Sequence, residues 1–184
     1  YMFWIDDAQP MCRCPRCRAY SDSDQALILE HAMLKAARTV DPRASLCHLA
    51  YTRTLPPPTQ VKPEPGIFLQ FAPIERVFTV PLSDPTGTIG PDGPNHGRLV
   101  EYLDANLEWF GKEGADVLEY WLDNSRFSGW RRDKIGKVPW NRELYLDDLR
   151  TYARRGIRSV RTYAFWFDKD YVGKYGEPPI DEYA

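Results

Sequence analysis

The chain has 184 residues, a length typical of one domain and sufficient for a core of ordinary size. Its 24 basic and 26 acidic residues leave a net charge of −2, and no basic stretch resembles a nucleic-acid-binding surface. The apolar runs are too short to span a bilayer and no signal peptide opens the chain, so we expect neither nucleic acid nor a membrane as a partner.

The first half of the chain predicts a strand, a helix and two further strands. Residues 1–5 form a short apolar run that ends in two carboxylates. Ser21 followed by Asp24 is a helix start, and apolar residues then recur at helical spacing as far as Val40, before a proline stops the helix. Residues 45–51 and 66–72 are predicted strands on either side of a proline-rich loop.

The second half begins with a long surface excursion over residues 73–97, which are rich in proline and glycine. Apolar spacing over 99–110 predicts an amphipathic helix. A strand over 115–123 and a loop over 125–140 follow. Asn141 then caps a helix that ends at Gly156, and residues 157–167 form the last strand.

Strands that alternate with helices imply a parallel sheet, either open and doubly wound or closed into a (β/α)₈ barrel. Long aromatic loops after the strands and the lack of a glycine-rich phosphate turn favour the barrel. Four or five strands are too few to close it. We therefore expect one α/β domain over residues 1–184, the C-terminal part, roughly half, of a TIM barrel with about strands 4 to 8. The N-terminal part of the barrel would be absent from this chain and would be its structural partner.

Asp6 and Asp7 are the candidate catalytic residues. They follow a predicted strand, and active sites of parallel barrels lie at the carboxyl ends of the strands. One acid can protonate a leaving oxygen while the other stabilises charge, because two nearby carboxylates push their pKa values apart. A solvated loop or helix cap is the alternative interpretation of the pair.

Polar residues at every second position of the predicted strand 115–123 indicate a barrel lumen. Glu119, Trp121 and Asp123 would face that lumen, while Leu118 and Tyr120 would face the helices. Asp123 would bind sugar hydroxyls near the strand end. Glu119 lies deeper, and a buried acid paired with an arginine such as Arg161 remains the alternative.

Cys12, Cys14 and Cys17 form a C-x-C-x-x-C segment, and three such close thiols ligate zinc when a fourth ligand arrives. Cys47 or His48 is the candidate fourth ligand. We expect a structural zinc ion and no cofactor required for catalysis. Reduced structural cysteines or a disulfide are the alternatives. Clustered cysteines without a visible signal sequence favour the cytoplasm.

The remaining histidines carry little chemistry in this interpretation. His31 lies on a predicted helix and His96 in a predicted loop, so both are expected at the surface. His48 lies within a predicted strand, where a hydrogen-bonded core histidine is the more common outcome. The sequence contains neither a G-x-S-x-G elbow nor an H-E-x-x-H motif.

The segment Phe3-Trp4-Ile5-Asp6-Asp7, the C-x-C-x-x-C motif and the segment Tyr120-Trp121-Leu122-Asp123 resemble the bacterial domain-of-unknown-function 4838 family. That family is placed among glycoside-hydrolase-like TIM barrels. The resemblance covers nearly the whole chain and is most specific at the cysteines. It implies a fold and a carbohydrate substrate class rather than a reaction.

A looser resemblance is to hexosaminidases and O-GlcNAc hydrolases, which place an acidic pair after the fourth strand and use the substrate's acetamido oxygen as nucleophile. It implies that Asp7 is the general acid and that Asp6 orients the acetamido group, although the reverse order stays open. Hexosaminidases proper carry Asp-Glu there, whereas this Asp-Asp pair is closer to the O-GlcNAc hydrolases.

We therefore hypothesise a glycoside hydrolase acting on a glycan, with an N-acetylhexosamine as one candidate sugar. Aromatic faces stack on sugars while acids hold hydroxyls. A non-catalytic carbohydrate-binding barrel, and a zinc-binding or redox cysteine protein, are the alternatives. The residues expected to bind the sugar are Trp4, Tyr51, Glu119, Tyr120, Trp121, Asp123 and Trp166.

Overall fold

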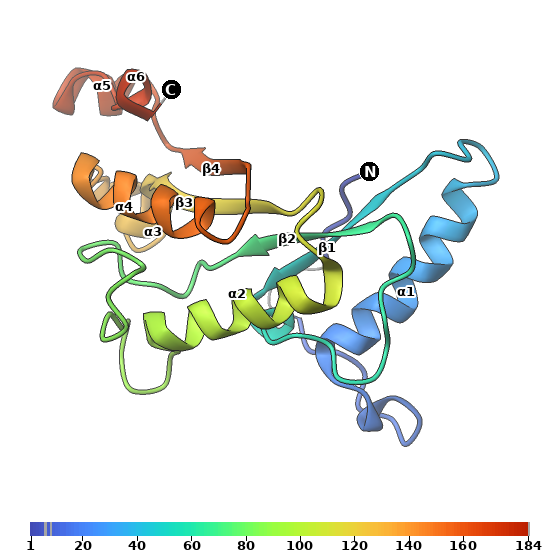
Figure 1. The fold of residues 1–184 in the computed structure, drawn as a ribbon. Coiled ribbons are helices and arrows are strands. Elements are labelled where there is room, and N and C mark those ends of the chain that lie inside the picture. The colour runs from blue at the N-terminus through green and yellow to red at the C-terminus, as the bar shows by residue number, and fades with distance from the viewer. Residues whose placement is uncertain (6, 8, 184) are drawn as a thin grey trace.

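The computed structural model describes residues 1–5, 7 and 9–183, and a four-stranded parallel sheet forms its centre (Figure 1). The strands lie in the sheet in their order along the chain. They are β1 (Leu46–Tyr51), β2 (Ile67–Ala72), β3 (Asp116–Asp123) and β4 (Ser159–Phe165). The expected α/β class, with parallel strands that alternate with helices, is confirmed.

Three long helices accompany the sheet: α1 (Asp22–Ala37), α2 (His96–Phe110) and α4 (Arg142–Ala153). Each has a side chain that caps its first turn, because the first backbone N–H groups of a helix lack partners within it. Ser21 and Asp24 form a reciprocal capping box on α1. Asn95 accepts a hydrogen bond from the Arg98 N–H at the start of α2, and Asn141 caps α4 in the same way.

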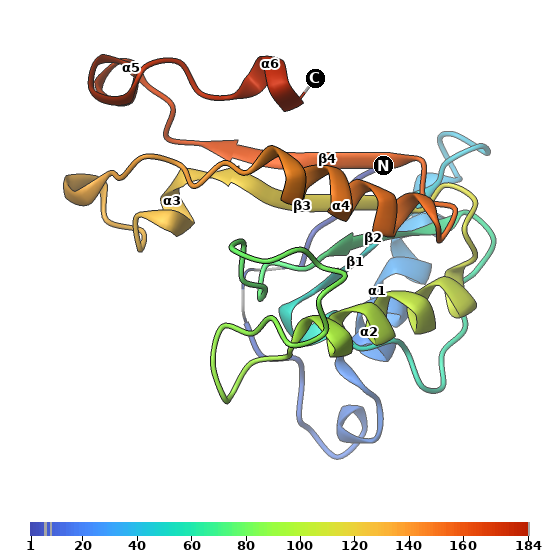
Figure 2. The same ribbon diagram turned by 60° about the vertical axis from the view of Figure 1, so that its left-hand side comes forward.

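Shorter elements fill the connections. They are α3 (Asn124–Phe127), α5 (Lys169–Tyr175), α6 (Ile180–Tyr183) and three short 3-10 helices, η1 (Cys17–Ala19), η2 (Thr52–Thr54) and η3 (Arg132–Lys134). The sequence did not predict α5 and α6, which lie beyond β4 and away from α1 and α2 (Figure 1, Figure 2). The predicted loop over 125–140 is partly helical, since α3 and η3 fall within or beside it.

The predicted strand over residues 1–5 is not a regular strand. The Tyr1 carbonyl accepts a hydrogen bond from the Cys47 N–H at 3.0 Å, so the segment begins beside β1. The ladder does not continue, because the Phe3 N–H donates to the Cys47 Sγ at 3.4 Å instead of to a backbone carbonyl. The Trp4 indole N–H instead donates to the Gln70 side chain of β2 at 2.7 Å.

The three long helices cover one face of the sheet (Figure 2). On β1, His48 contacts Glu30 of α1 through a hydrogen bond and stacks on Phe110 of α2 with ring centroids 4.7 Å apart. On β3, Glu119 accepts a hydrogen bond from Tyr152 of α4. Adjacent strand residues point to opposite faces, so the residues between these positions face the side without long helices, called the open face below.

A buried charge cluster holds β3 and α4 against the loop that follows β2. The Arg76 guanidinium lies 2.7 Å from the Glu119 carboxylate and 2.8 Å from that of Asp148, and all three side chains are fully buried. Asp148 also accepts hydrogen bonds from the Leu82 N–H and from the Trp121 indole. Burial alone would lower the pKa of Arg76, but the two carboxylates outweigh it and raise that pKa.

Two further expectations about this region need correction. His96, expected at the surface, is fully buried at the start of α2 and hydrogen-bonds to the Pro81 carbonyl at 2.9 Å. Burial lowers its pKa, which favours the neutral ring. The partner of Glu119 is Arg76 rather than Arg161, which pairs instead with Asp116 across the open face.

Helix α1 ends at Ala37 instead of reaching Val40, which is 87% exposed. Among the residues that the structure describes, no helix is both long and apolar enough to cross a bilayer.

The charge cluster predicts a large loss of stability when its cation is removed. Replacing Arg76 with methionine should lower the free energy of unfolding by about 3–5 kcal/mol, because two buried carboxylates lose their counter-charge. Urea unfolding measures this change. The control is Arg98→Met, which breaks an exposed pair with Glu101 within α2 and should cost less than about 0.5 kcal/mol. Equal losses in the two variants would contradict the assigned role.

Candidate functional site

A pocket of about 430 Å³ lies on the open face at the carboxyl ends of the strands, a volume in the range of small-molecule sites. Aromatic side chains from the N-terminal segment, from β1, β3 and β4 and from the loop after α3 dominate its wall, and two carboxylates join them. Its residues include Trp4, Asp7, Tyr51, Tyr120, Asp123, Trp130, Tyr163 and Phe165. Such a pocket presents flat apolar surfaces beside a few polar groups, which is how proteins bind small polar molecules with an apolar face.

Asp7 reaches this pocket from the loop that follows residues 1–5. Its Oδ1 accepts a hydrogen bond from the Tyr51 hydroxyl at 2.9 Å, which holds the carboxylate beside the end of β1. Burial and this hydrogen bond raise the pKa of Tyr51, so the phenol remains a donor at neutral pH. Asp6, the other half of the predicted pair, lies outside the described residues.

Asp123 lines the same pocket from the end of β3. Its Oδ1 accepts hydrogen bonds from the Ser125 N–H and hydroxyl, and it caps α3. Arg126 of that helix donates to the Arg76 carbonyl at 2.7 Å. This hydrogen bond connects α3, which follows Asp123, to the backbone of the buried charge cluster. Asp7 and Asp123 therefore converge on one pocket from separate segments of the chain.

An irregularity in β3 corrects the predicted alternation along that strand. Between Glu119 and Leu122 the register against β4 shifts, with two residues of β3 opposite one of β4. Such a bulge reverses which face the following residues point to. Tyr120 and Asp123 both line the pocket for this reason, although they are three positions apart.

Glu119 and Trp121 are not among the described residues that line the pocket, so the prediction that they face the lumen is wrong. Both side chains are buried under α4, where Glu119 pairs with Arg76 and the Trp121 indole donates to Asp148 at 2.9 Å. Leu118, expected to face the helices, lines the pocket instead. The alternation of polar residues predicted the wrong face for Glu119, because its partner on the helix side, Arg76, lies 43 positions away in the sequence.

Trp166 is not among the described residues that line the pocket. It lies directly after β4 with its ring 5.9 Å from that of Phe165, and the Arg132 guanidinium lies 5.4 Å above its ring. Its φ of 64° is strained for a residue with a side chain. Thr52 after β1 and Trp130 after β3 also have positive φ, so the backbone strain gathers at the carboxyl ends of the strands.

Sequence analysis missed Tyr163 and Phe165 of β4 as pocket residues. Both are more than a third exposed, and Tyr163 packs near Tyr120 with ring centroids 6.1 Å apart. Alternation along the predicted strand 157–167 could have found them, because both share a face with Arg161.

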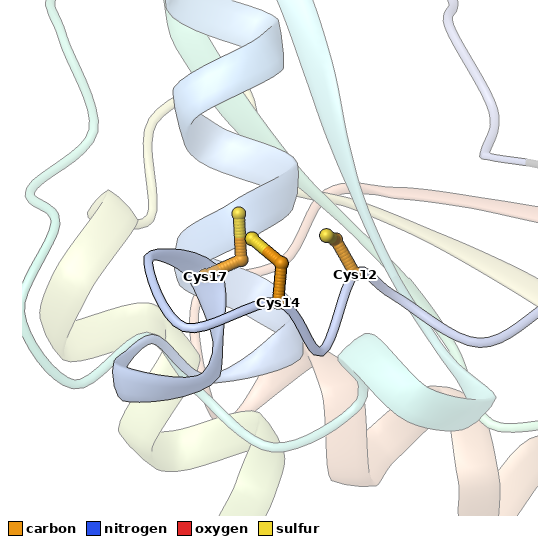
Figure 3. Close-up of side chains that lie close together, drawn as sticks. All are labelled: Cys12, Cys14 and Cys17. Carbon is orange, nitrogen blue, oxygen red and sulfur yellow. The ribbon is translucent and has the colours of Figure 1, made fainter.

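The second cluster is the group of cysteines in the loop before α1 (Figure 3). The Sγ atoms of Cys12, Cys14 and Cys17 all lie within 4.8 Å of one another, so this group could hold a metal ion. The Cys14 carbonyl accepts the N–H of Cys17 at 3.1 Å and that of Arg18 at 3.0 Å, which folds the loop back on itself. The turn therefore brings together thiols that are distant in an extended chain.

The pKa values of Cys14 and Cys17 are shifted in opposite directions. Backbone hydrogen bonds from Cys17 and Arg16 lower the pKa of Cys14 to about 7. Hydrogen bonding to Cys14 raises the pKa of Cys17 to about 11. One of the three is thus partly a thiolate at neutral pH, which is the form that ligates metals.

The structure does not bring the predicted fourth ligand to this group. Cys47 is buried on β1, where its thiol donates to the Phe3 carbonyl at 3.4 Å, and it lies outside the three-thiol cluster. His48 faces the opposite side of the sheet and bonds to Glu30. Neither Cys47 nor His48 therefore lies with the three thiols in this structure.

The end of the cysteine loop is fixed to the body of the protein by Asp24 and Gln25. Asp24 accepts hydrogen bonds from the N–H groups of Thr59, Gln60 and Val61 at 2.8–3.0 Å, and the Gln25 side chain donates to the Cys17 carbonyl at 3.2 Å. Burial alone would raise the pKa of Asp24, but these hydrogen bonds outweigh it and hold that pKa well below its usual range.

The fold and this pocket define an α/β protein with a ligand-sized aromatic site at the carboxyl ends of parallel strands. Comparison of the chain with family models, with curated proteins and with solved structures finds no match in any of the three.

Asp24 predicts an acid-sensitive step in stability. Because its folded pKa is depressed, the carboxylate stabilises the fold above about pH 4, and this contribution is lost as the pH falls further. Asp24→Ala should lower the free energy of unfolding by about 3 kcal/mol at pH 7. The difference in the free energy of unfolding between Asp24→Ala and the unmodified protein should become smaller below about pH 4.

Urea unfolding at pH 7, 5 and 3 measures this effect. The matched control is Asp22→Ala, because Asp22 lies two residues before Asp24 in the same helical turn and pairs with the exposed side chain of Arg13. It should cost less than about 1 kcal/mol at every pH. A loss in Asp24→Ala that does not change with pH would show that the charged form carries no stability.

Proposed function

We propose that this chain is the C-terminal part of a (β/α)₈ barrel, which a further part of the protein completes. Three observations support the proposal. The strands follow one another in chain order without a switch point, whereas doubly wound sheets reverse their order. The long helices share one face. The edge strand β4 is largely exposed, with Tyr163 and Phe165 on the open face that a barrel would enclose as its lumen.

The function that the geometry supports best is that of a glycoside hydrolase. The observation that carries it is the convergence of Asp7 and Asp123 on one aromatic pocket at the carboxyl ends of the strands. The planar faces of Trp4 and Tyr120 suit the C–H surfaces of a sugar ring, while carboxylates and phenols suit its hydroxyls. In barrels, catalytic groups lie at this end of the strands. The resemblance to glycoside-hydrolase-like barrels agrees with this proposal.

Asp7 is the proposed general acid. Its carboxyl group lies in the pocket, and the Tyr51 hydroxyl orients it at 2.9 Å. A carboxyl group held in this way can give a proton to the leaving glycosidic oxygen, which takes up the electron pair of the breaking C–O bond. The substrate's acetamido oxygen or a water molecule would form the new bond to the anomeric carbon, and water would complete the hydrolysis and return a proton to Asp7. Asp6 would stabilise the charge that develops on the sugar or orient an acetamido group. Asp123, capped by Ser125, would bind a hydroxyl.

The proposal predicts that Asp7→Asn removes activity from the full-length protein. Hydrolysis of a panel of aryl glycosides, including the N-acetylglucosaminide, should fall by about a hundredfold or more, because an amide cannot supply the proton. The control is Asp92→Asn, an equivalent change at an exposed loop position outside the pocket, which should leave turnover unchanged.

Equal turnover by the unmodified protein and Asp7→Asn would overturn the catalytic role. Calorimetric binding of a sugar without any product after long incubation would favour the second candidate, a carbohydrate-binding barrel. The specific observation behind that candidate is the aromatic wall itself, which binds a sugar whether or not a proton is transferred.

Zinc is the metal that we propose for the three thiols. Zn²⁺ prefers thiolate sulfur and tetrahedral coordination, and three close thiols supply three of its four ligands. The ion would have no part in bond cleavage, because Cys12, Cys14 and Cys17 are not among the described residues that line the pocket.

A further inference from the structure

The cysteine cluster and the candidate acid belong to one short loop. Asp7 lies in the pocket, and Cys12 follows it by five residues, while Cys17 follows it by ten. The loop therefore has one end at the pocket and the other at the start of α1. A metal ion on the three cysteines would therefore fix a point of the chain five residues after Asp7.

The far end of this loop is already anchored. The Cys17 carbonyl accepts the Gln25 side chain at 3.2 Å, and the Ala19 carbonyl accepts the Gln60 side chain at 2.7 Å. Cys12 and Cys14, in contrast, are exposed, as are Arg13 and Arg16 between and beside them. Arg13 makes a surface ion pair with Asp22, and such pairs hold a chain weakly.

We infer that a zinc ion bound by Cys12, Cys14 and Cys17 fastens the Asp7 side of the loop to the anchored start of α1, and so positions Asp7 in the pocket. The inference rests on the proposed function for the role of Asp7. Each thiol loses its proton to solvent as it binds the ion. Three protein ligands would leave one position of a tetrahedral zinc site for water, because the Cys47 thiol bonds to the Phe3 carbonyl and lies outside the cluster.

The size of the effect follows from loop closure. On the C-terminal side of Asp7, metal binding shortens the span to the next anchored residue from ten residues, at Cys17, to five, at Cys12. Halving the length of a flexible loop lowers the entropic cost of holding its end in place. The fraction of molecules in which that end is held then rises about threefold. Removing zinc should therefore weaken a ligand that contacts Asp7 by about threefold, without unfolding the protein.

The experiment compares the reduced full-length protein, loaded with one equivalent of Zn²⁺ or stripped by a chelator, with two variants. Cys14→Ser removes an exposed ligand, and Cys47→Ala removes the other cysteine of the chain. Elemental analysis should find one zinc per chain in the unmodified protein and in Cys47→Ala, and none in Cys14→Ser. Circular dichroism establishes that all three proteins remain folded.

Proteolysis and amide hydrogen exchange measure directly whether zinc makes the loop more rigid. Zinc should slow trypsin cleavage after Arg13, Arg16 and Arg18, which are exposed. It should also slow amide hydrogen exchange over residues 9–11, between the cysteines and Asp7, as well as over 12–17. Calorimetric titration with N-acetylglucosamine should show the threefold loss of affinity in the stripped protein and in Cys14→Ser.

The outcomes separate this inference from the proposed function. If zinc does not bind, or binds equally well to Cys14→Ser, the metal site is overturned. If it binds but exchange slows only over 12–17, its coupling to Asp7 is overturned. If exchange slows over 9–17 while N-acetylglucosamine does not bind, the metal-dependent positioning stands and the assigned sugar fails. A disulfide among the three thiols in protein purified without reductant would leave too few ligands and would also overturn the site.

Discussion

The buried guanidinium of Arg76 is the interaction on which the rest of this structure depends. It comes from the loop after β2 and binds one carboxylate from β3 and one from α4, with all three side chains out of contact with water. Charges this deep are tolerated only when they are paired and hydrogen-bonded. The cluster therefore fixes the face of β3 that lies against the helices, and by alternation it fixes the face that is left for the pocket.

The pocket results from that constraint together with one irregularity. Leu118 and Tyr120 face the open side because Glu119 between them faces Arg76. The bulge that follows returns Asp123 to the same side, where it lies opposite Phe165 in the register with β4. Without the bulge, Asp123 would share the helix face with Glu119, and the pocket would lack its second carboxylate. Bulges beside functional sites commonly redirect a side chain in this manner.

Asp7 and the three cysteines lie on one stretch of sequence before α1, which links the two candidate sites of the protein. At one end Asp7 accepts the Tyr51 hydroxyl, and at the other the capping box of α1 and the hydrogen bonds of Asp24 hold the chain. The cysteine turn lies between them. An arrangement of this kind lets a structural site influence a binding site without touching the ligand, because the two share one short stretch of backbone.

The sequence by itself determined the parallel α/β class, the helix starts at Ser21, Asn95 and Asn141 to within a few residues, and the closeness of the three thiols. These features depend on local caps, periodicity and spacing, which operate over a few positions. Only the tertiary structure decided that Glu119 faces Arg76, that Cys47 bonds to Phe3 and that β3 has a bulge between Glu119 and Leu122. Each of these outcomes depends on a partner more than 40 residues away, or on a register shift that no local pattern encodes.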